Sequence, residues 1–112
     1  MVTEVAAPSP GDPFEALRDP NRRQILQILS AGDRPVGEIA AAMPISRPAV
    51  SRHLRLLKDA GMVVERSQGT QRIYHLREGG MRAVQVYLEG VWGEAATRFR
   101  LMAENTEGGS KR

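Results

Sequence analysis

The chain has 112 residues, a length that fits one domain because two separate cores would each be too small to offset the entropy of ordering the backbone. Hydrophobic residues make up 41% and charged residues 26%, as in ordinary globular proteins, and the lack of cysteine excludes disulfides, thiolate metal sites and a cysteine nucleophile. The sequence has no apolar run of membrane-spanning length and no signal-peptide pattern at its start, so we expect no membrane partner and a cytoplasmic location.

The N-terminal part of the chain predicts an arm followed by two helices. Residues 1–11 are rich in Pro, Ala and Ser, which is typical of a flexible arm. The pair Asp12-Pro13 predicts the start of a helix, because an aspartate side chain caps free N–H groups and proline suits the first turn. The pair Asp19-Pro20 repeats this signal, and we expect the second helix to run from about 21 to 30.

Two further helices, joined by a tight turn, are expected next. A short alanine-rich helix covers 37–43, and Pro44 cannot continue it. Ser46 can cap a fourth helix that extends to about Ala60. Two short helices joined in this way are typical of the helix-turn-helix, in which the second helix enters the major groove of DNA.

The fourth helix has two distinct faces. Val50, Leu54 and Leu57 recur at the spacing of one inward face. A polar and basic stripe on another side consists of Arg47, Ser51, Arg55 and Lys58. We interpret this stripe as a row of hydrogen-bond donors directed outward, with Lys58 as a solvated residue.

A β-hairpin follows the fourth helix. Residues 62–66 and 70–76 are rich in β-branched and aromatic side chains, and the connection over 67–69 contains a glycine. A hairpin directly after a recognition helix is the wing of a winged helix. Its tip carries donors suited to phosphates or the minor groove, namely Arg66, Gln68, Thr70, Gln71 and Arg72.

A last helix is expected over 81–104, and residues 105–112 are expected to form a disordered tail. Its apolar stripe exceeds what one small core can cover, so a second copy of the chain is the expected cover. The predicted interface residues are Phe14, Leu17, Val84, Leu88, Val91, Trp92, Ala95, Phe99 and Met102. The fold class is therefore mainly α with a small β-hairpin, a winged helix-turn-helix of order α-α-α-α-β-β-α over residues 12–104 that dimerises through its first and last helices.

The charge is distributed unevenly. Residues 45–77 hold seven basic and two acidic side chains, a local net charge of +5 in a chain of net charge +3. A basic segment on a slightly acidic body indicates a nucleic-acid reader, although a solvated charged face has the same appearance. The predicted DNA-binding residues are Ser46, Arg47, Pro48, Ser51, Arg52, His53, Arg55, Arg66, Gln68, Gln71 and Arg72.

Three segments of the sequence resemble a known family. The run from Phe14 to Leu26 resembles the opening helices of ArsR/SmtB-type repressors. The segments 36–40 and 45–63, which include Ser51-Arg52-His53-Leu54, look like their helix-turn-helix, and Tyr74-His75-Leu76 is similar to the end of their wing. The resemblance implies a winged-helix dimer that represses a promoter, usually its own.

Many members of that family sense metals, and the sequence departs from both of their sites. The positions that match the cysteines of the thiolate site are Pro35 and Gly37, which cannot bind a metal. The last helix has no histidine and offers only Glu89, Glu94 and Glu104, which are poor ligands for zinc or copper without imidazole partners. We therefore expect no metal and no cofactor.

Several residue roles stay open at this point. His53 is either a donor to DNA or a half-buried residue packing against the wing, and Ser51 either contacts DNA or merely permits its close approach. Arg47 and Arg52 could read guanine, but most hydrogen bonds from proteins to DNA go to the backbone. Trp92 and Phe99 are expected in the interface rather than in an effector pocket. A small-molecule effector held between the first and last helices, or no effector, are both compatible with the sequence.

The sequence thus predicts a sequence-specific, autoregulatory transcriptional repressor that binds a pseudo-palindromic operator in double-stranded DNA as a homodimer. A winged-helix scaffold for protein binding is the alternative, but it would have no reason to carry a stripe of arginines. An enzyme is not expected, because the sequence has no phosphate loop and no histidine beside a carboxylate.

Overall fold

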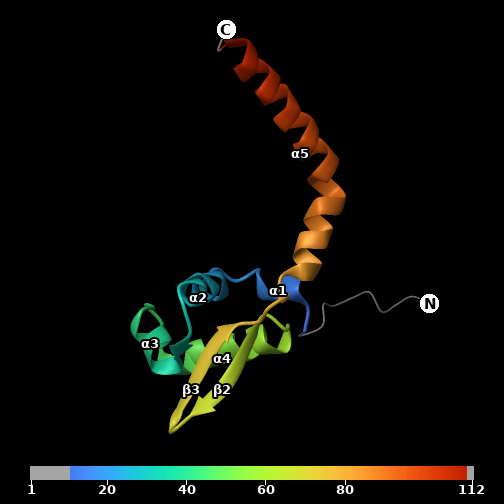
Figure 1. The fold of residues 1–112 in the computed structure, drawn as a ribbon. Coiled ribbons are helices and arrows are strands. Elements are labelled where there is room, and N and C mark those ends of the chain that lie inside the picture. Colours follow the sequence, from blue (N-terminus) through green and yellow to red (C-terminus); the bar gives the residue numbers. More distant parts are fainter. Residues whose placement is uncertain (1–10, 111–112) are drawn as a thin grey trace, which may run out of the picture. The chain divides into compact units, whose positions relative to one another are not determined.

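The computed structural model describes residues 11–110, without the side chains of residues 96, 97 and 105–110. The expected N-terminal arm therefore lies outside the described residues, apart from Gly11. The chain divides into two compact units, which meet in sequence between Met81 and Arg82. Its elements are α1 (Pro13–Ala16), α2 (Pro20–Ser30), β1 (Arg34–Pro35), α3 (Val36–Ala41), α4 (Arg47–Asp59), β2 (Val63–Gln68), β3 (Gln71–Leu76) and α5 (Arg82–Ser110) (Figure 1).

Side-chain caps begin three helices of the first unit where the sequence predicts them. The Asp12 carboxylate accepts a hydrogen bond from the N–H of Phe14 at 2.9 Å, and Asp19 accepts one from the N–H of Asn21 at 2.7 Å. The Ser46 hydroxyl accepts a hydrogen bond at 3.2 Å from an N–H in the first turn of α4. Each such cap stabilises a helix by about 1 kcal/mol, which fixes where α1, α2 and α4 start.

The core of the first unit lies among α2, α3, α4 and the hairpin. Val50, Leu54 and Leu57 are each 0% exposed, which confirms the predicted inward face of α4. They pack with the buried residues Ile25, Leu29, Ile39, Met43, Met62, Val63 and Tyr74. Burying a side chain of this size contributes about 1.5–3 kcal/mol, so the inward stripe fixes the rotation of α4 about its own axis. The basic stripe on the neighbouring side of the helix is thereby directed outward.

The sheet has three antiparallel strands in the order β1-β3-β2, and the expectation of a two-stranded hairpin was incomplete. The added strand β1 pairs Arg34 with Tyr74 and Pro35 with Ile73. Two residues carry no readable periodicity, so the sequence did not indicate this strand. Proline is tolerated there because β1 lies at the edge of the sheet.

The wing is longer and its loop shorter than expected. Strand β2 continues to Gln68, which pairs with Gln71, so only Gly69 and Thr70 form the loop rather than residues 67–69. Gly69 has a φ of +64°, and glycine is favoured at the first position of a two-residue type II′ hairpin loop. In Figure 1 the hairpin extends beyond the helices of this unit to a free tip.

The second unit is the single helix α5. It ends at Ser110, later than the expected Glu104, because each further residue of an established helix adds one hydrogen bond at little cost. Large apolar side chains are exposed along it, including Leu88, Val91, Trp92 and Phe99. Across the described residues, no helix combines the length and apolar character needed to cross a membrane.

Gly80, which follows the wing, is packed against backbone. A Cβ at this position would lie 2.8 Å from the carbonyl oxygen of Gly61 and 3.0 Å from that of Arg77. Backbone atoms cannot move aside as a flexible side chain can, so Gly80→Ala is expected to lower the free energy of unfolding by about 1–3 kcal/mol. Urea unfolding at fixed protein concentration measures this change.

The matched control for this prediction is Gly90→Ala in α5. A Cβ at Gly90 meets no atom within 4 Å, and alanine favours a helix over glycine by up to about 1 kcal/mol. Gly90→Ala should therefore leave stability unchanged or raise it. Equal unfolding midpoints for the two variants would contradict the tight packing at Gly80.

Candidate nucleic-acid interface

The candidate interface begins with the outward face of α4. Arg47, Ser51 and Arg55 are exposed on this helix, about a quarter turn around it from the buried stripe. Successive members lie about one turn apart, so their polar ends form a row along the helix. The predicted outward stripe is therefore present in the structure.

Two neighbouring grooves separate this face from the wing. The groove near the wing tip, which we call the tip groove, has a volume of about 420 Å³ and is lined by Pro35, Val36, Gly37, Glu38, Arg47, Thr70, Gln71 and Arg72. The second, which we call the helix groove, has a volume of about 340 Å³ and is lined by Val36, Arg47, Ser51, Arg55, Lys58, Glu65, Arg72 and Tyr74. Arg47 and Arg72 line both, so α4 and the wing present one continuous basic surface.

A carboxylate from the wing lies within this surface. Glu65 accepts a hydrogen bond from Lys58 Nζ at 3.0 Å and one from Arg72 Nη1 at 2.7 Å. The Tyr74 hydroxyl donates to the same carboxylate at 3.4 Å. Lys58 is exposed, as the sequence suggested, and it also forms an ion pair within the groove. Glu65 links the end of α4 to both strands of the wing.

The surroundings of this carboxylate change two pKa values. The hydrogen bond from Lys58 and the positive charges of Lys58 and Arg72 lower the pKa of Glu65 despite its partial burial. Burial, together with the neighbouring charge of Glu65, raises the pKa of the Tyr74 hydroxyl. At neutral pH the cluster therefore contains an ionised carboxylate, two cations and a neutral tyrosine.

The other predicted wing residues lie at or near the tip. Gln68 and Gln71 are exposed and pair with each other across the last step of the hairpin. Arg66 is also exposed, but its Nη1 forms an ion pair with Asp33 at 3.0 Å. An exposed pair of this kind is worth at most about 1 kcal/mol, so a phosphate can compete for Arg66.

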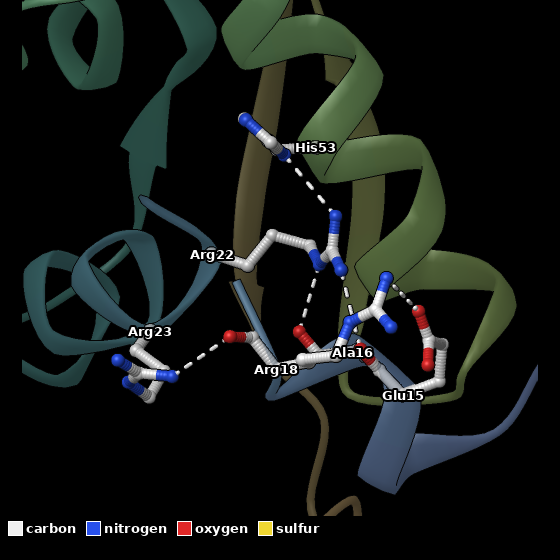
Figure 2. A network of polar contacts seen from close by, with 6 residues as sticks. All are labelled: Glu15, Ala16, Arg18, Arg22, Arg23 and His53. Atoms are coloured by element: carbon white, nitrogen blue, oxygen red, sulfur yellow. Dashed lines mark hydrogen bonds and ion pairs between the residues drawn. The ribbon is translucent and has the colours of Figure 1, made fainter. Parts of the chain in front are cut away.

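His53 is half-buried and faces α2 rather than the wing. Its Nδ1 lies 3.4 Å from Arg22 Nη1. A dashed line in Figure 2 marks this contact. Because a guanidinium can only donate, this contact requires the neutral His53 tautomer that carries its proton on Nε2. The Nε2 nitrogen points away from Arg22 in Figure 2 and keeps a donor for another partner. Of the two alternatives for His53, the half-buried position agrees with the packed one, and the polar partner that it meets there is Arg22 of α2.

Arg22 also ties α4 to the end of α1. Its side chain is buried, and it donates from Nε to the carbonyl of Ala16 at 2.7 Å and from Nη2 to that of Glu15 at 3.2 Å. The last carbonyls of a helix have no partner within it. The Glu15 carbonyl also accepts from the N–H of Arg18 at 3.1 Å, so it is the bond to Ala16 that satisfies a group α1 leaves free. Burial opposes the ionisation of the nearby Asp19, but hydrogen bonds from the backbone N–H groups of Asn21 and Arg22, together with the charge of Arg22, outweigh it and lower the pKa of Asp19.

The remaining predicted DNA-binding residues lie at the edges of this surface. Ser46 and Pro48 are exposed at the start of α4, and Ser46 also caps the helix. Arg52 is exposed as well but lines neither groove. The structure therefore brings together Arg47, Ser51, Arg55, Gln71 and Arg72, and it leaves Arg52, His53 and Arg66 outside that group.

Most of the predicted interface residues are exposed. This holds for Phe14 on α1 and, on α5, for Leu88, Val91, Trp92, Ala95, Phe99 and Met102. Leu17 is half-buried, and Val84 is buried. Trp92 makes an edge-to-face contact with Tyr87 at a centroid distance of 6.3 Å, which extends the apolar stripe sideways. The role of the predicted interface residues in forming a dimer stays a prediction.

The sequence analysis did not predict groove residues from three places: the wing, β1 and α3. The residue from β1 is Pro35, which lines the tip groove. Glu65 and Tyr74 face each other across the hairpin, and a two-residue loop would have predicted this pairing. Glu38 lies at the start of α3 and lines the tip groove. No group of three or more His, Cys, Asp or Glu side chains within the described residues could hold a metal ion.

A recognition helix with an outward basic face, preceded by a short helix and followed by a β-hairpin, defines the winged helix-turn-helix class. Residues 19–64 match the family described as bacterial regulatory protein, arsR family. The chain is 40% identical over 97 residues to the HTH-type transcriptional regulator Rv2034 of Mycobacterium tuberculosis, covering 87% of this chain and 91% of the relative. It is 44% identical over 62 residues to the transcriptional repressor SdpR of Bacillus subtilis, covering 55% of this chain and 68% of that protein.

Solved structures agree with these sequence relatives. One, described as a possible transcriptional regulator for arsenical resistance, superposes with a TM-score of 0.67 at 37% identity and covers 72% of this chain and 84% of that chain. Another, the homodimeric winged helix-turn-helix DNA-binding domain Mb0332 from Mycobacterium bovis, gives a TM-score of 0.59 at 34% identity and covers 69% of this chain and 75% of that chain. The chain belongs to the ArsR family and is a transcriptional regulator with a DNA-binding winged helix-turn-helix.

Proposed function

We propose that this protein is a sequence-specific repressor that binds a pseudo-palindromic operator, including one upstream of its own gene, as a homodimer. The observation that carries this proposal is the continuous basic surface formed by α4 and the wing. Arg47 and Arg55 have no ion-pair partner among the described residues, so they are available to phosphates and base edges.

Repression and dimerisation draw support from the relatives. SdpR is named as a repressor, and Mb0332 is described as homodimeric. The exposed apolar side chains of α5 are consistent with an interface, because a helix that exposes so many large apolar groups in one copy needs a cover. A second copy related by two-fold symmetry would place two recognition helices on one face of the DNA.

Selection from a library of random-sequence duplexes, followed by footprinting on DNA upstream of the gene, tests the proposal. We expect the selected duplexes to contain two half-sites of opposite orientation whose centres lie about one helical turn apart, or a multiple of it. The mass of the free protein in solution should be that of a dimer. Selected duplexes without shared sequence, or a monomer that protects a single half-site, would contradict it.

Protection of the upstream DNA decides whether the protein regulates its own gene. If the selected duplexes are symmetric but the upstream DNA is not protected, the autoregulatory part of the proposal fails and the remainder stands. If no duplex binds, the winged-helix scaffold for protein binding becomes the better account of the fold.

A further inference from the structure

The helix groove contains two classes of cation. Arg47 and Arg55 form no ion pair within the described part of the chain, whereas Lys58 and Arg72 both pair with the Glu65 carboxylate. A surface intended only to attract phosphate would not be expected to place an acid between two of its four cations. Glu65 is therefore the one lining residue whose charge opposes DNA binding in this groove.

The carboxylate lies deeper than the cations that it holds. The Glu65 side chain is 16% exposed, whereas those of Lys58 and Arg72 are 51% and 65% exposed. Both cations can therefore contact a ligand without leaving the carboxylate. Arg72 has five N–H donors, of which one reaches Glu65, so its guanidinium is oriented but not consumed by the pair.

We propose that Glu65 is a positioning residue that holds Lys58 and Arg72 across the helix groove and, by offsetting their charge, restricts tight binding to the preferred DNA sequence. This inference rests on the proposed function. Binding to DNA of any sequence depends on how many phosphates the cations neutralise. A built-in negative charge weakens such binding, whereas contacts to the correct sequence profit from cations already held in place.

The lowered pKa of Glu65 is consistent with this role, since the carboxylate stays ionised throughout the neutral range. Tyr74 adds a third donor from the neighbouring strand, which fixes the carboxylate in the groove. A carboxylate held by three donors from two elements is better suited to orienting cations than a freely rotating surface acid.

The test compares Glu65→Gln with Glu38→Gln. Glu38 is an exposed acid that lines the adjacent tip groove and forms no ion pair among the described residues, so both variants remove one negative charge from the same surface. Affinity is measured against salt concentration for two duplexes of equal length and composition. One is the duplex that the wild type selects from a random library, and the other is a scrambled duplex.

For Glu65→Gln we expect affinity for the scrambled duplex to rise on the order of tenfold at moderate salt, because two cations per subunit are released to phosphates. The plot of log affinity against log salt should become steeper by about 1–2 for each released pair. The ratio of selected to scrambled affinity should fall on the order of tenfold, whereas Glu38→Gln should change both quantities much less.

Glu65→Asp separates positioning from charge. The shorter side chain keeps the negative charge but cannot bridge both cations, so binding to the scrambled duplex should stay weak while affinity for the selected duplex falls. If Glu65→Gln matches Glu38→Gln in salt dependence and in affinity ratio, the role of Glu65 is refuted. A wild type without preference for any duplex would instead contradict the proposed function.

Discussion

Arg47→Ala is expected to weaken binding to the selected duplex on the order of thirtyfold to ten-thousandfold. Residues at the N-terminal end of a recognition helix contact base edges, and Arg47 is the first residue of α4. Each lost arginine contact costs about 1–3 kcal/mol, and a symmetric dimer loses one in each half-site. Arg47 also lines both grooves, and it is the first residue of the helix, a position that the other groove cations do not share.

Arg47→Lys distinguishes base reading from phosphate contact. A lysine keeps the charge but cannot make the bidentate contact by which arginine reads guanine. If Arg47 reads a base, Arg47→Lys should relax the sequence preference at one position of each half-site. If it contacts a phosphate, Arg47→Lys should keep the preference and much of the affinity.

Arg18→Ala is the matched control for the charge. Arg18 is an exposed arginine in the connection between α1 and α2, and its ion pair with Glu15 is of a kind that contributes little. Its loss should change affinity by less than about threefold, since it lies outside the grooves. Unfolding curves of all variants show whether the fold is intact. Wild-type affinity in a folded Arg47→Ala variant would exclude this residue from the interface.

The helices were predictable because their signals are local. An aspartate or serine caps its own first turn, and the spacing of Val50, Leu54 and Leu57 sets which face of α4 is buried. Once that face is known, the direction of Arg47 and Arg55 follows from helical geometry. The core of the fold and the α4 side of the candidate interface could therefore be read from the sequence.

Which side chains of the wing line the helix groove depends on whether the hairpin loop has two residues or three. A connection over residues 67–69 pairs Glu65 with Gln71, whereas the observed loop of Gly69 and Thr70 pairs it with Tyr74. A change of register decides which side chains share a face of the sheet. The Glu65 cluster is a consequence of that register, so it could not be predicted from an approximate hairpin.

The inward contacts of His53 could not be predicted because they depend on a buried arginine. Arginine is expected on the surface, and nothing local in the sequence shows that Arg22 is an exception. Its burial depends on carbonyls from α1 and an imidazole from α4, which only the tertiary fold brings together (Figure 2). Side chains that link elements distant in sequence are the part of a site that pattern reading misses.

Arg22→Met is expected to lower the free energy of unfolding by about 2–4 kcal/mol, the largest effect on stability that we predict. Methionine can occupy the space of the arginine stem, but it cannot donate to Glu15 or Ala16. Replacing both partners of a buried polar pair can be neutral, whereas here the partners are backbone carbonyls that no substitution removes. The buried Ala16 carbonyl left without a donor costs about 1–3 kcal/mol, and the lost bond to Glu15, whose carbonyl keeps the N–H of Arg18, costs about 0.5–1.5 kcal/mol.

Arg23→Met provides the matched comparison, because Arg23 donates to the next two carbonyls, those of Leu17 and Arg18, at an exposed position. Water can replace these bonds, so the expected loss is below about 1 kcal/mol. Arg22→Lys should fall between the two, since a single ammonium cannot reach every acceptor of the guanidinium. Urea unfolding at one protein concentration measures all three, and equal losses for Arg22→Met and Arg23→Met would show that the α1 carbonyls do not depend on a buried donor.

Since Arg22 also contacts His53 on α4, its loss should weaken DNA binding at temperatures where the variant is still folded, and Arg23→Met should leave binding unchanged.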